Sequence, residues 1–562
     1  MPTVTPTVSL NVYFSGIGSS STDIAADVML GVAPLRGTYG IGGSGPLARI
    51  AQTGVLTFAL NNSVSNSGGV QGYYSPGHVD ARANWDLGLI ISVTFSYSGT
   101  NYIKFIGTLS SIKPDAGAYQ RQAVLCTVVD WMDEAARSKV KAIAVQTGQR
   151  SDQLVSTIVS NAVGRQPIAT SYQTGKSTFD YALDNLRDNS TTVMRALSDV
   201  VMSEMGYLYV KGTTDAAGAK GGQLVFENRE TRPIKGDADH TFSNDMVRFD
   251  VQRSRADIIN RTYVSVHPRT LDTVATTLWE LTSTEVVPVV PALSTTTIVA
   301  EFTESLINGV NFGGSSVTTA RGKQVATTNL TTPSSGTDWI ANSAADGSGS
   351  NLTSSVTVSI ATTAANTATL TLVNAGAADA YLTTLQLRGI ALRDETVTTS
   401  TASDSTSITD YGEQDIRINM PYESSPYNSL GVAEWVTGVN ASPRFLVRSM
   451  EVVGNTSGAM LTQALVREPG DKIGVDELVT GISNRTAWLL GTAGSSELDE
   501  TAYLDFNPAS GDFFINGVQF DLSPGNILRV RWNLAPAQQQ RFWILQQAGA
   551  SELGTTTVLG WA

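Results

Sequence analysis

The chain of 562 residues contains little cysteine, histidine or charge. Its single cysteine, Cys126, excludes an internal disulfide, and the apolar stretch 123–129 around it predicts a buried side chain in a strand. We therefore expect no extracellular scaffold stapled by disulfides. The histidines His78, His240 and His267 lie far apart beside turns or a proline, and no Gly-x-Ser-x-Gly motif occurs, so no catalytic triad is expected.

Charge is sparse and mostly negative. Charged residues make up 15% of the chain, against about 25% in an average soluble protein, and the formal net charge is −13. Gripping DNA requires clustered lysines and arginines that release counterions from the phosphates, and this chain lacks that surplus. An acidic wall would instead let DNA slide past.

Long apolar runs are also missing. The longest candidate, 87–95, is far shorter than the roughly 20 residues that span a bilayer, and Gly88, Ser92 and Thr94 interrupt it. The opening MPTVTP has neither a basic segment nor an apolar run, so we expect no secretion signal and a protein that stays in the cytoplasm where it is made.

The sequence is instead rich in Thr, Ser, Gly, Val and Ala, a composition that favours β-sheet over helix when charge is sparse. The length allows about four domains of about 150 residues each. In the N-terminal part, strands are predicted between turns rich in Gly, Asn and Ser, at 8–14, 54–60, 89–97 and 102–109, with a hairpin turn at 98–101.

The segment that follows mixes strands and helices. A strand at 122–129 leads into a helix after Asp130. Ser151 is expected to cap a second helix that ends at Gly164. Ser177 is expected to cap another helix, and Thr191 or Thr192 one more.

The stretch 203–229 predicts a helix end that feeds a two-stranded hairpin. The helix is expected to stop at Gly206, because glycine tolerates the left-handed conformation that closes a helix. Strands are predicted at 207–210 and 223–227, on either side of a Gly/Ala/Asp/Lys loop.

Farther along, Pro288 and Pro291 break the strand pattern, and a block rich in Thr, Ser, Ala and Gly occupies 293–393. Alternating apolar residues, as in Val356, Val358 and Ile360, predict one buried face, so we interpret the block as an inserted β-sandwich, with disorder as the alternative. Further strands are predicted at 367–373, 381–387 and 389–392.

Two turns are predicted near the C-terminus. Gly470 supplies the positive φ of a tight Pro-Gly-Asp turn, in which Asp471 bonds its own backbone. The dipeptide Asn516-Gly517 within 513–520 is a strong hairpin signal. Strands at 527–532 and 542–545 are expected to follow.

Two glycine motifs resemble nucleotide-binding loops but lack the necessary context. Gly40-x-Gly42-x-x-Gly45 is followed by Pro46, and no acidic residue appears before Asp80, so we interpret it as a plain loop.

The tripeptide 175–177 matches the end of a phosphate-binding loop, but Thr170 replaces its first glycine.

Two acidic clusters have residue types found in metal or hydrolase sites. Asp237, Asp239 and His240 could bind a metal ion, although side chains so placed on a polar loop are usually solvated. Glu301 and Glu304 could serve glycoside cleavage only if the fold placed them about 5 to 10 Å apart. No residue is therefore assigned a catalytic, cofactor-binding or metal-binding role, and no cofactor is expected.

Several segments together resemble the tail hub (baseplate hub, minor tail) proteins of long-tailed bacteriophages and related gene transfer particles. In chain order they are TGVLTFALNNS, YYSPGH and the hairpin before IKPD in the N-terminal part, the hairpin segment 203–229, DIINRTYVSVHPR from Asp257, SITDYG from Ser407, EPGDKI from Glu468, and the ending SELGTTTVLGW. The resemblance covers about 1–290 and 395–562 and leaves the inserted block outside it.

The resemblance implies a mainly β, multidomain fold with an α+β segment, two hub β-barrel-like domains and the inserted β-sandwich. The expected divisions are a first hub β-domain, an α+β domain with a terminal hairpin, a second hub β-domain in two pieces, the accessory sandwich, and a C-terminal β segment that packs on the hub. In that order they span 1–115, 116–245, 246–292 with 394–498, 293–393, and 499–562.

The resemblance also implies a function. It predicts a non-enzymatic virion protein at the tail tip, assembled in the host cytoplasm, whose three copies form a ring of six similar β modules around the DNA channel. The expected partners are the distal tail protein, the tape-measure protein and tail fibre or receptor-binding proteins. DNA would pass without specific binding, and the insert would contact the host surface or neighbouring tail proteins.

Two alternatives come from other classes. One is a secreted or surface carbohydrate-binding β-protein, suggested by the aromatic residues Trp339 and Tyr381, which the pattern predicts to be exposed. The other is a tail-associated hydrolase, which would need paired carboxylates in a cleft.

Overall fold

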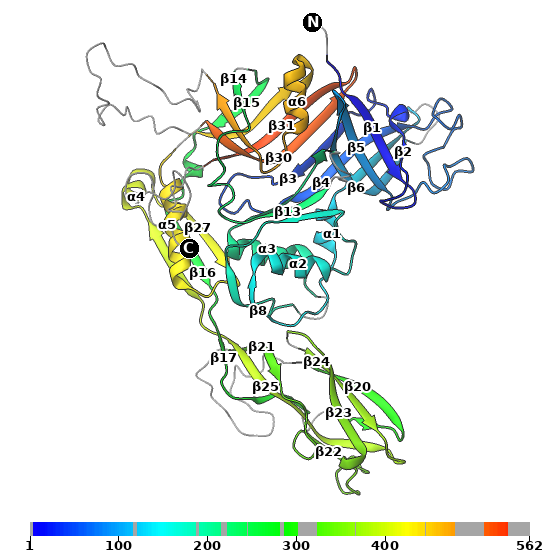
Figure 1. Ribbon diagram of the computed structural model, residues 1–562, viewed down its shortest axis with the longest axis vertical. Helices are drawn as coiled ribbons and strands as arrows, with labels where there is room; N and C mark the ends of the chain where they lie inside the picture. The colour runs from blue at the N-terminus through cyan, green and yellow to red at the C-terminus, as the bar shows by residue number, and fades with distance from the viewer. Residues whose placement is uncertain are drawn as a thin grey trace.

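The chain folds into several β-sheets and a smaller set of helices, mainly β with an α+β segment, as predicted (Figure 1). The computed structural model describes residues 4–115, 121–186, 190–214, 222–243, 245–281, 286–301, 323–365, 367–443, 445–477 and 511–537. The expected strand at 542–545, the ending SELGTTTVLGW and Glu304 lie outside these residues. No helix among the described residues is long and apolar enough to cross a membrane.

The N-terminal strands form half of the largest sheet, and five of the seven lie where the sequence predicts a strand, whereas those at 22–23 and 35–40 are additional. They are β1 (Thr7–Tyr13), β2 (Thr22–Asp23), β3 (Leu35–Gly40), β4 (Gln52–Asn61), β5 (Ile90–Tyr97), β6 (Thr100–Pro114) and β7 (Ala123–Val129). Ser98 and Gly99 take positive φ values of 48° and 78° between β5 and β6, which confirms the predicted hairpin turn. Cys126 is buried in β7, and burial raises the pKa of its thiol to about 12.

Strands from the distant C-terminal part complete the same sheet. They are β14 (His240–Ser243), β15 (Arg248–Gln252), β28 (Leu446–Val453), β29 (Lys472–Asp476), β30 (Asp512–Ser523) and β31 (Ile527–Pro536), with helix α6 (Gly458–Val466) packed against them. The two halves meet where β3 pairs antiparallel with β30, from Leu35 opposite Leu522 to Gly40 opposite Gly517. One 14-stranded sheet with one shared apolar core therefore contains both ends of the described chain.

The predicted Asn516-Gly517 hairpin is wrong. β30 continues through both residues, and its register with β31 shifts between Ile515 and Gly517, so the dipeptide forms a β-bulge. The chain instead reverses at Gly525 and Asn526, whose φ values are 81° and 56°.

Tertiary hydrogen bonds explain why Asn516 lies inside a strand. Its side chain is 1% exposed; the amide nitrogen donates to the Gly43 carbonyl at 2.6 Å, and the amide oxygen accepts from Arg232 at 2.7 Å. A local turn preference is weaker than a set of buried hydrogen bonds that would otherwise be lost.

An α/β unit lies under the sheet (Figure 1). One mixed sheet contains β9 (Ala169–Tyr172), β13 (Gln223–Glu227) and β11 (Tyr207–Lys211). A two-stranded antiparallel sheet contains β8 (Gln146–Arg150) and β10 (Thr178–Ala182). The short strand β12 (Thr213–Thr214) joins the large sheet. The helices are α1 (Trp131–Arg137), α2 (Ser151–Ser160) and α3 (Val193–Glu204), and all three contribute to one core.

Two of the predicted helix starts are confirmed, one is shifted, and one is wrong. The helix predicted after Asp130 is α1, which Asp130 caps, and Thr192, one of the two predicted positions, caps α3. α2 begins at Ser151, but Arg150 occupies the cap position, and the helix ends before Gly164. The helix predicted after Ser177 is wrong, because residues 178–182 pair as a strand with β8.

The end of α3 also differs from the prediction. Met205, with a φ of 58°, takes the left-handed conformation instead of Gly206. Gly206 is required for another reason, since a Cβ there would lie 2.5 Å from the carbonyl oxygen of Glu227. The hairpin of β11 and β13 that follows is confirmed.

A third unit consists of a three-stranded sheet with a helix packed on one face. The strands are β26 (Thr398–Ser403), β16 (Arg261–Val266) and β27 (Asp415–Met420), and the helices are α4 (Ser405–Tyr411) and α5 (Pro426–Asn440). Apolar residues of β16, β27 and α5 share a core with Met205 at the end of α3.

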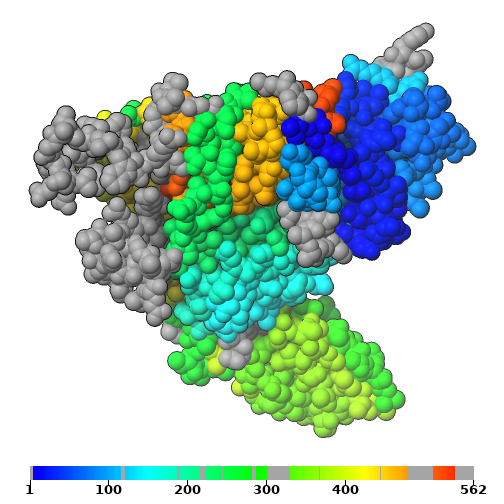
Figure 2. Space-filling view, turned by 45° about the horizontal axis from the view of Figure 1, so that its top comes forward, coloured from blue at the N-terminus to red at the C-terminus, as the bar shows by residue number. Residues whose placement is uncertain are grey.

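The inserted block is a β-sandwich at the far end of the molecule (Figures 1 and 2). The long strand β25 (Ala380–Asp394) is the centre of one sheet, with β17 (Arg269–Leu271), β18 (Thr276–Glu280), β19 (Val289–Val290), β21 (Lys323–Leu330) and β22 (Trp339–Asn342). The other sheet is β20 (Ser294–Glu301), β24 (Thr367–Asn374) and β23 (Val356–Thr363). Both sheets bury side chains in one core, which includes the predicted Val356 and Val358.

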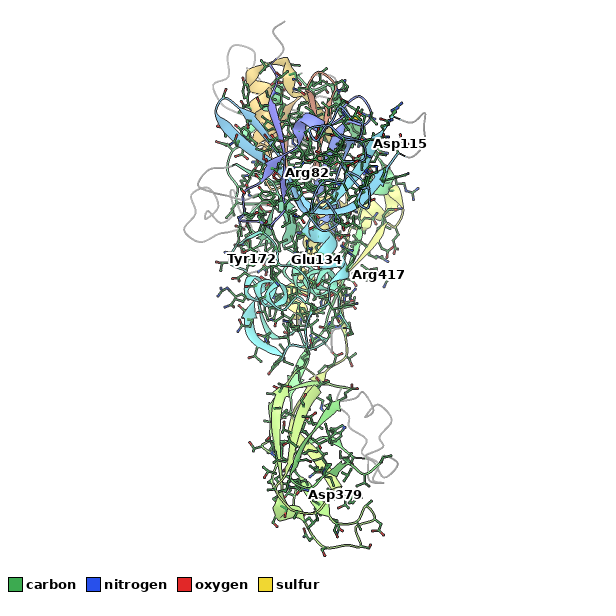
Figure 3. The ribbon with its side chains drawn as sticks, turned by 90° about the vertical axis from the view of Figure 1, so that its right-hand side faces the viewer. Arg82, Asp115, Glu134, Tyr172, Asp379 and Arg417 are labelled. Carbon is green, nitrogen blue, oxygen red and sulfur yellow. The ribbon has the colours of Figure 1, made fainter. Side chains whose placement is uncertain are left out.

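The strands β17, β18 and β19, which precede residue 293 in the sequence, also pair with β25. Asp379, labelled in Figure 3, lies near the tip of the sandwich, far from Arg82 and Asp115 at the opposite end of the molecule. We call residues 269–394 the insert lobe.

Candidate functional site: a buried arginine and aromatic junction

Arginine and aromatic side chains alternate where the large sheet, the α/β unit and the α5 unit meet. Arg49, in the loop between β3 and β4, lies with its guanidinium carbon 5.5 Å from the ring centre of Trp435 on α5 and 4.7 Å from that of Tyr207 on β11. Arg232, after β13, lies 3.6 Å from the Tyr207 ring centre and 5.4 Å from that of Phe514 on β30. We call these five residues the junction ladder. Cation–π contacts of this kind stabilise most when the cation is desolvated.

Arg232 in the junction ladder has its charge neutralised by a carboxylate. It is 4% exposed, its Nε donates to Glu227 at 3.0 Å, and its Nη1 donates to Asn516. Its Nη2 has no hydrogen-bond partner. Burial opposes the charge of Arg232, but Glu227 and Tyr207 outweigh that effect and raise its pKa.

Arg49 is held differently. It is 3% exposed and donates to the carbonyl oxygens of Pro46 at 2.9 Å and Met205 at 2.5 Å. Burial lowers the pKa of Arg49. Burial alone would raise the pKa of Tyr207, but the neighbouring guanidinium groups of Arg49 and Arg232 bring that pKa below its ordinary value.

A second buried cluster joins the two halves of the large sheet. Lys104 of β6 is 2% exposed, forms an ion pair with Glu468, and donates to the carbonyl oxygens of Leu465 at 3.1 Å and Arg467 at 3.0 Å, at the C-terminal end of α6. A cation at this end of a helix is favourable. The Tyr39 hydroxyl donates to Glu468 at 2.8 Å. Burial raises the pKa of Glu468 despite the attraction of Lys104.

The Pro-Gly-Asp turn beside this cluster is confirmed. Gly470 has a φ of 92°, and Asp471 accepts from the backbone N–H of Glu468 at 3.1 Å. A Cβ at Gly470 would lie 2.2 Å from the hydroxyl oxygen of Tyr209, so the turn must carry glycine for its contact as well as its φ.

The segment 175–177, which mimics a phosphate loop, binds side chains of this chain. The backbone N–H groups of Lys176 and Ser177 donate to the buried carboxylate of Glu204 at 3.2 and 2.7 Å, and that of Gly175 donates to Asp152 at 2.9 Å. Successive backbone N–H groups suit an anion. Here the anions are the Glu204 and Asp152 carboxylates of the same chain.

The remaining candidate residues that the structure describes make other contacts. Gly40, with a φ of 95°, packs on the Asn516 bulge, and a strand rather than a helix follows the loop. Asp239 pairs with Lys235 and accepts from the backbone of Lys472, so its carboxylate is engaged. Among the described residues, no three His, Cys, Asp or Glu side chains lie close enough to hold a metal ion.

The aromatic residues of the insert lobe are less exposed than the sequence suggests. Trp339 is 5% exposed and donates to the Val356 carbonyl at 3.2 Å, and Tyr381 is half-buried. The prediction that Trp339 is exposed is therefore wrong, because its ring fills the sandwich core.

Sequence reasoning missed the junction ladder and the Lys104–Glu468 pair. Their members come from distant parts of the chain, and each stands alone in its local pattern. One sequence feature could have revealed the pair: Lys104 is a cation inside the apolar strand predicted at 102–109. Lysine is almost never fully buried without a partner, so this position implies one.

No protein-family model and no curated protein matches the chain. Among solved structures, it is similar to the tail protein from Neisseria meningitidis MC58, at 9% identity and a TM-score of 0.43, over 94% of this chain and 96% of that one. It is also similar to the prophage MuSo2 43 kDa tail protein from Shewanella oneidensis, at 9% identity and a TM-score of 0.42, over 94% and 98%. A third is prophage tail protein gp18 from Listeria monocytogenes EGD-e, at 6% identity and a TM-score of 0.36, over 93% and 94%. Tail proteins are thus among the structures to which the chain is similar, as the sequence resemblance predicts.

Proposed function

We propose that the chain is a structural virion protein, a phage tail hub that forms a trimeric ring at the tail tip and joins the tail tube to receptor-binding parts. The observation that carries the proposal is the pairing of β3 with β30, which places the N-terminal strands and the C-terminal strands side by side in one sheet. Each chain thereby supplies two adjacent β modules, and three chains would supply the six that the resemblance implies.

The buried clusters support a rigid adaptor. The junction ladder ties the large sheet to the α/β and α5 units, and the Lys104–Glu468 cluster ties together the two halves of the large sheet. Both use charged groups that are costly to separate once buried. A hub that transmits load between the tail tube and the tip needs fixed relations between its parts, and these contacts provide them.

The composition supports passage of DNA without binding. The net charge of −13 leaves the chain without the cationic surplus that phosphate binding uses. We propose that DNA crosses the ring through an acidic channel, and that the distal tail and tape-measure proteins contact the ring on its tube side.

The insert lobe is proposed to face outward and to contact the host surface or neighbouring tail proteins. It projects from the α/β unit at the end opposite the large sheet (Figures 1 and 2). The outward face of β20, β24 and β23 is rich in threonine, with Thr297, Thr371 and Ser359 in register across it, and Glu301 at its end is its charged residue among those described. Such a flat face suits contact with another surface better than it suits catalysis.

The test is the position of the chain in assembled particles. Gold-labelled antibody against the insert lobe should mark the tail tip in electron micrographs of intact tails, and polysaccharide-binding assays on the purified chain should give no signal above a control protein. Label spread over the host cell surface, with saturable polysaccharide binding, would favour the carbohydrate-binding alternative instead.

A further inference from the structure

Arg49 is a buried cation whose charge no carboxylate balances within the described part of the chain. It donates to the carbonyl oxygens of Pro46 and Met205 and also bonds the Tyr207 side chain, and no carboxylate of the described residues pairs with it. Carbonyl dipoles satisfy the N–H groups but leave the net charge in place. Burial of an unbalanced charge is unfavourable, so such a group usually has a counterion.

The charge of the neighbouring Arg232 does have a counterion. Arg232 is paired with Glu227, and both side chains are buried, so that end of the junction ladder is neutral. The residual positive charge of the ladder therefore belongs to Arg49.

An unused hydrogen-bond donor lies beside Arg49. The indole Nε1 of Trp435 is buried and has no hydrogen-bond partner, and the Trp435 ring centre is 5.5 Å from the guanidinium carbon of Arg49. A buried donor without an acceptor costs free energy, and an ordered water or ion is the usual explanation in a native structure.

We propose that the junction ladder binds one small monovalent anion, such as chloride, held by the Nε1–H of Trp435 and the charge of Arg49. A single N–H and a single unbalanced charge match a small monovalent ion. Phosphate would bring further oxygens that require donors and more charge than Arg49 neutralises. The bound anion is a structural counterion where the large sheet, the α/β unit and the α5 unit meet.

The position proposed for the ion lies near the surface of the molecule. Trp435 and Tyr207, which flank Arg49, are both half-buried, so the ladder lies just beneath the surface at this end. The proposal is independent of the tail-hub function, because it concerns only the charge and donor balance of the folded chain.

The test compares unfolding temperatures of the full chain in sodium chloride and in sodium gluconate at equal ionic strength. Chloride should raise the unfolding temperature in a saturable manner, as expected for a ligand that binds only the folded state. Trp435→Phe keeps the ring over Arg49 but removes the N–H, and it should abolish the chloride response or weaken its half-saturation at least tenfold.

Trp532→Phe is the matched control. The indole N–H of Trp532 is also buried without a partner, but its ring lies against Phe242, and no arginine of the described ranges lies over it. This variant should keep the full chloride response, and crystals soaked in bromide should show an anomalous peak beside Arg49. Equal stability in both salts, an undiminished response in Trp435→Phe, or a water molecule at this position would overturn the proposal.

Discussion

Arg269 at the start of the insert lobe donates to both carboxylate oxygens of Asp184 in the α/β unit, at 2.6 and 3.1 Å. Its Nη1 also donates to the carbonyl oxygens of His267 and Pro421. The Asp184 side chain is 1% exposed and that of Arg269 is 10% exposed. This buried ion pair, which we call the Arg269 clamp, therefore joins the insert lobe to the α/β unit. The backbone contact of Ala365 with Ile143, at 2.9 Å, provides a second attachment.

Removal of this clamp should loosen the lobe. Arg269→Ala leaves the Asp184 carboxylate buried without its partner, which should lower the free energy of unfolding by about 3–5 kcal/mol. Arg269→Lys should recover only part of the loss, because an ammonium group cannot make the bidentate contact. Chemical denaturation measures the loss, and limited proteolysis should show faster cleavage between body and lobe. The exposed pair Arg36–Asp521 provides the control, since Arg36→Ala should cost about 0–1 kcal/mol.

Asp130 predicts a pH dependence of stability. Burial raises the pKa of Asp130 from 3.8 to about 7, although the backbone N–H groups of α1 oppose that shift. Between these values the unfolded chain has lost the proton while the folded chain retains it, so this group makes stability fall as pH rises from about 4 to about 7 and stay level above.

The check is the pH profile of unfolding in Asp130→Asn. Asparagine is also a good helix cap, so the α1 start should persist while this part of the pH dependence disappears. Asp379→Asn, at an exposed position in the insert lobe, should keep the profile of the unmodified chain. Identical profiles for Asp130→Asn and the unmodified chain would refute the assignment.

Asn516 tests the role of the bulge in β30. Asn516→Ala leaves the Nη1 group of Arg232 and the Gly43 carbonyl without the Asn516 side chain as partner, so we expect a loss of about 2–4 kcal/mol in denaturant unfolding. Asn526 occupies the actual turn with a positive φ, and Asn526→Gly should change stability by less than about 1 kcal/mol. Unchanged stability in Asn516→Ala would contradict the role assigned to the buried bulge.

The Asn516 case illustrates what the sequence could predict. Alternating and apolar patterns located β4, β5, β6, β7 and β31 within a few residues, because those strands bury one face whatever their neighbours are. Local turn chemistry also located the turns at Ser98-Gly99 and Gly470, which depend on the backbone alone.

The sequence failed where a residue serves a distant partner. Serine is a common N-cap residue, but the backbone N–H of Ser177 donates to Glu204, and the residues after it pair with β8 as a strand. The junction ladder draws its side chains from β11, β30, α5 and two loops, so no local window contains its pattern. Its assembly depends on the tertiary fold.

Deletion of the insert lobe tests its accessory role. Arg269 lies opposite Asp394 in the β17–β25 register, so residues 270–393 can be replaced by a short Asn-Gly turn that keeps the Arg269 clamp. The shortened chain should fold and assemble as the full chain does, while adsorption of particles to host cells falls at least tenfold. Loss of assembly would place the lobe within the hub itself.

The most direct test of the central claim is the native mass of the purified chain at micromolar concentration, measured by light scattering after size exclusion. A trimeric hub predicts a mass three times the chain mass of 59.5 kDa and threefold ring particles in electron micrographs. A single species at the chain mass, with no threefold particle in tails, would contradict the account.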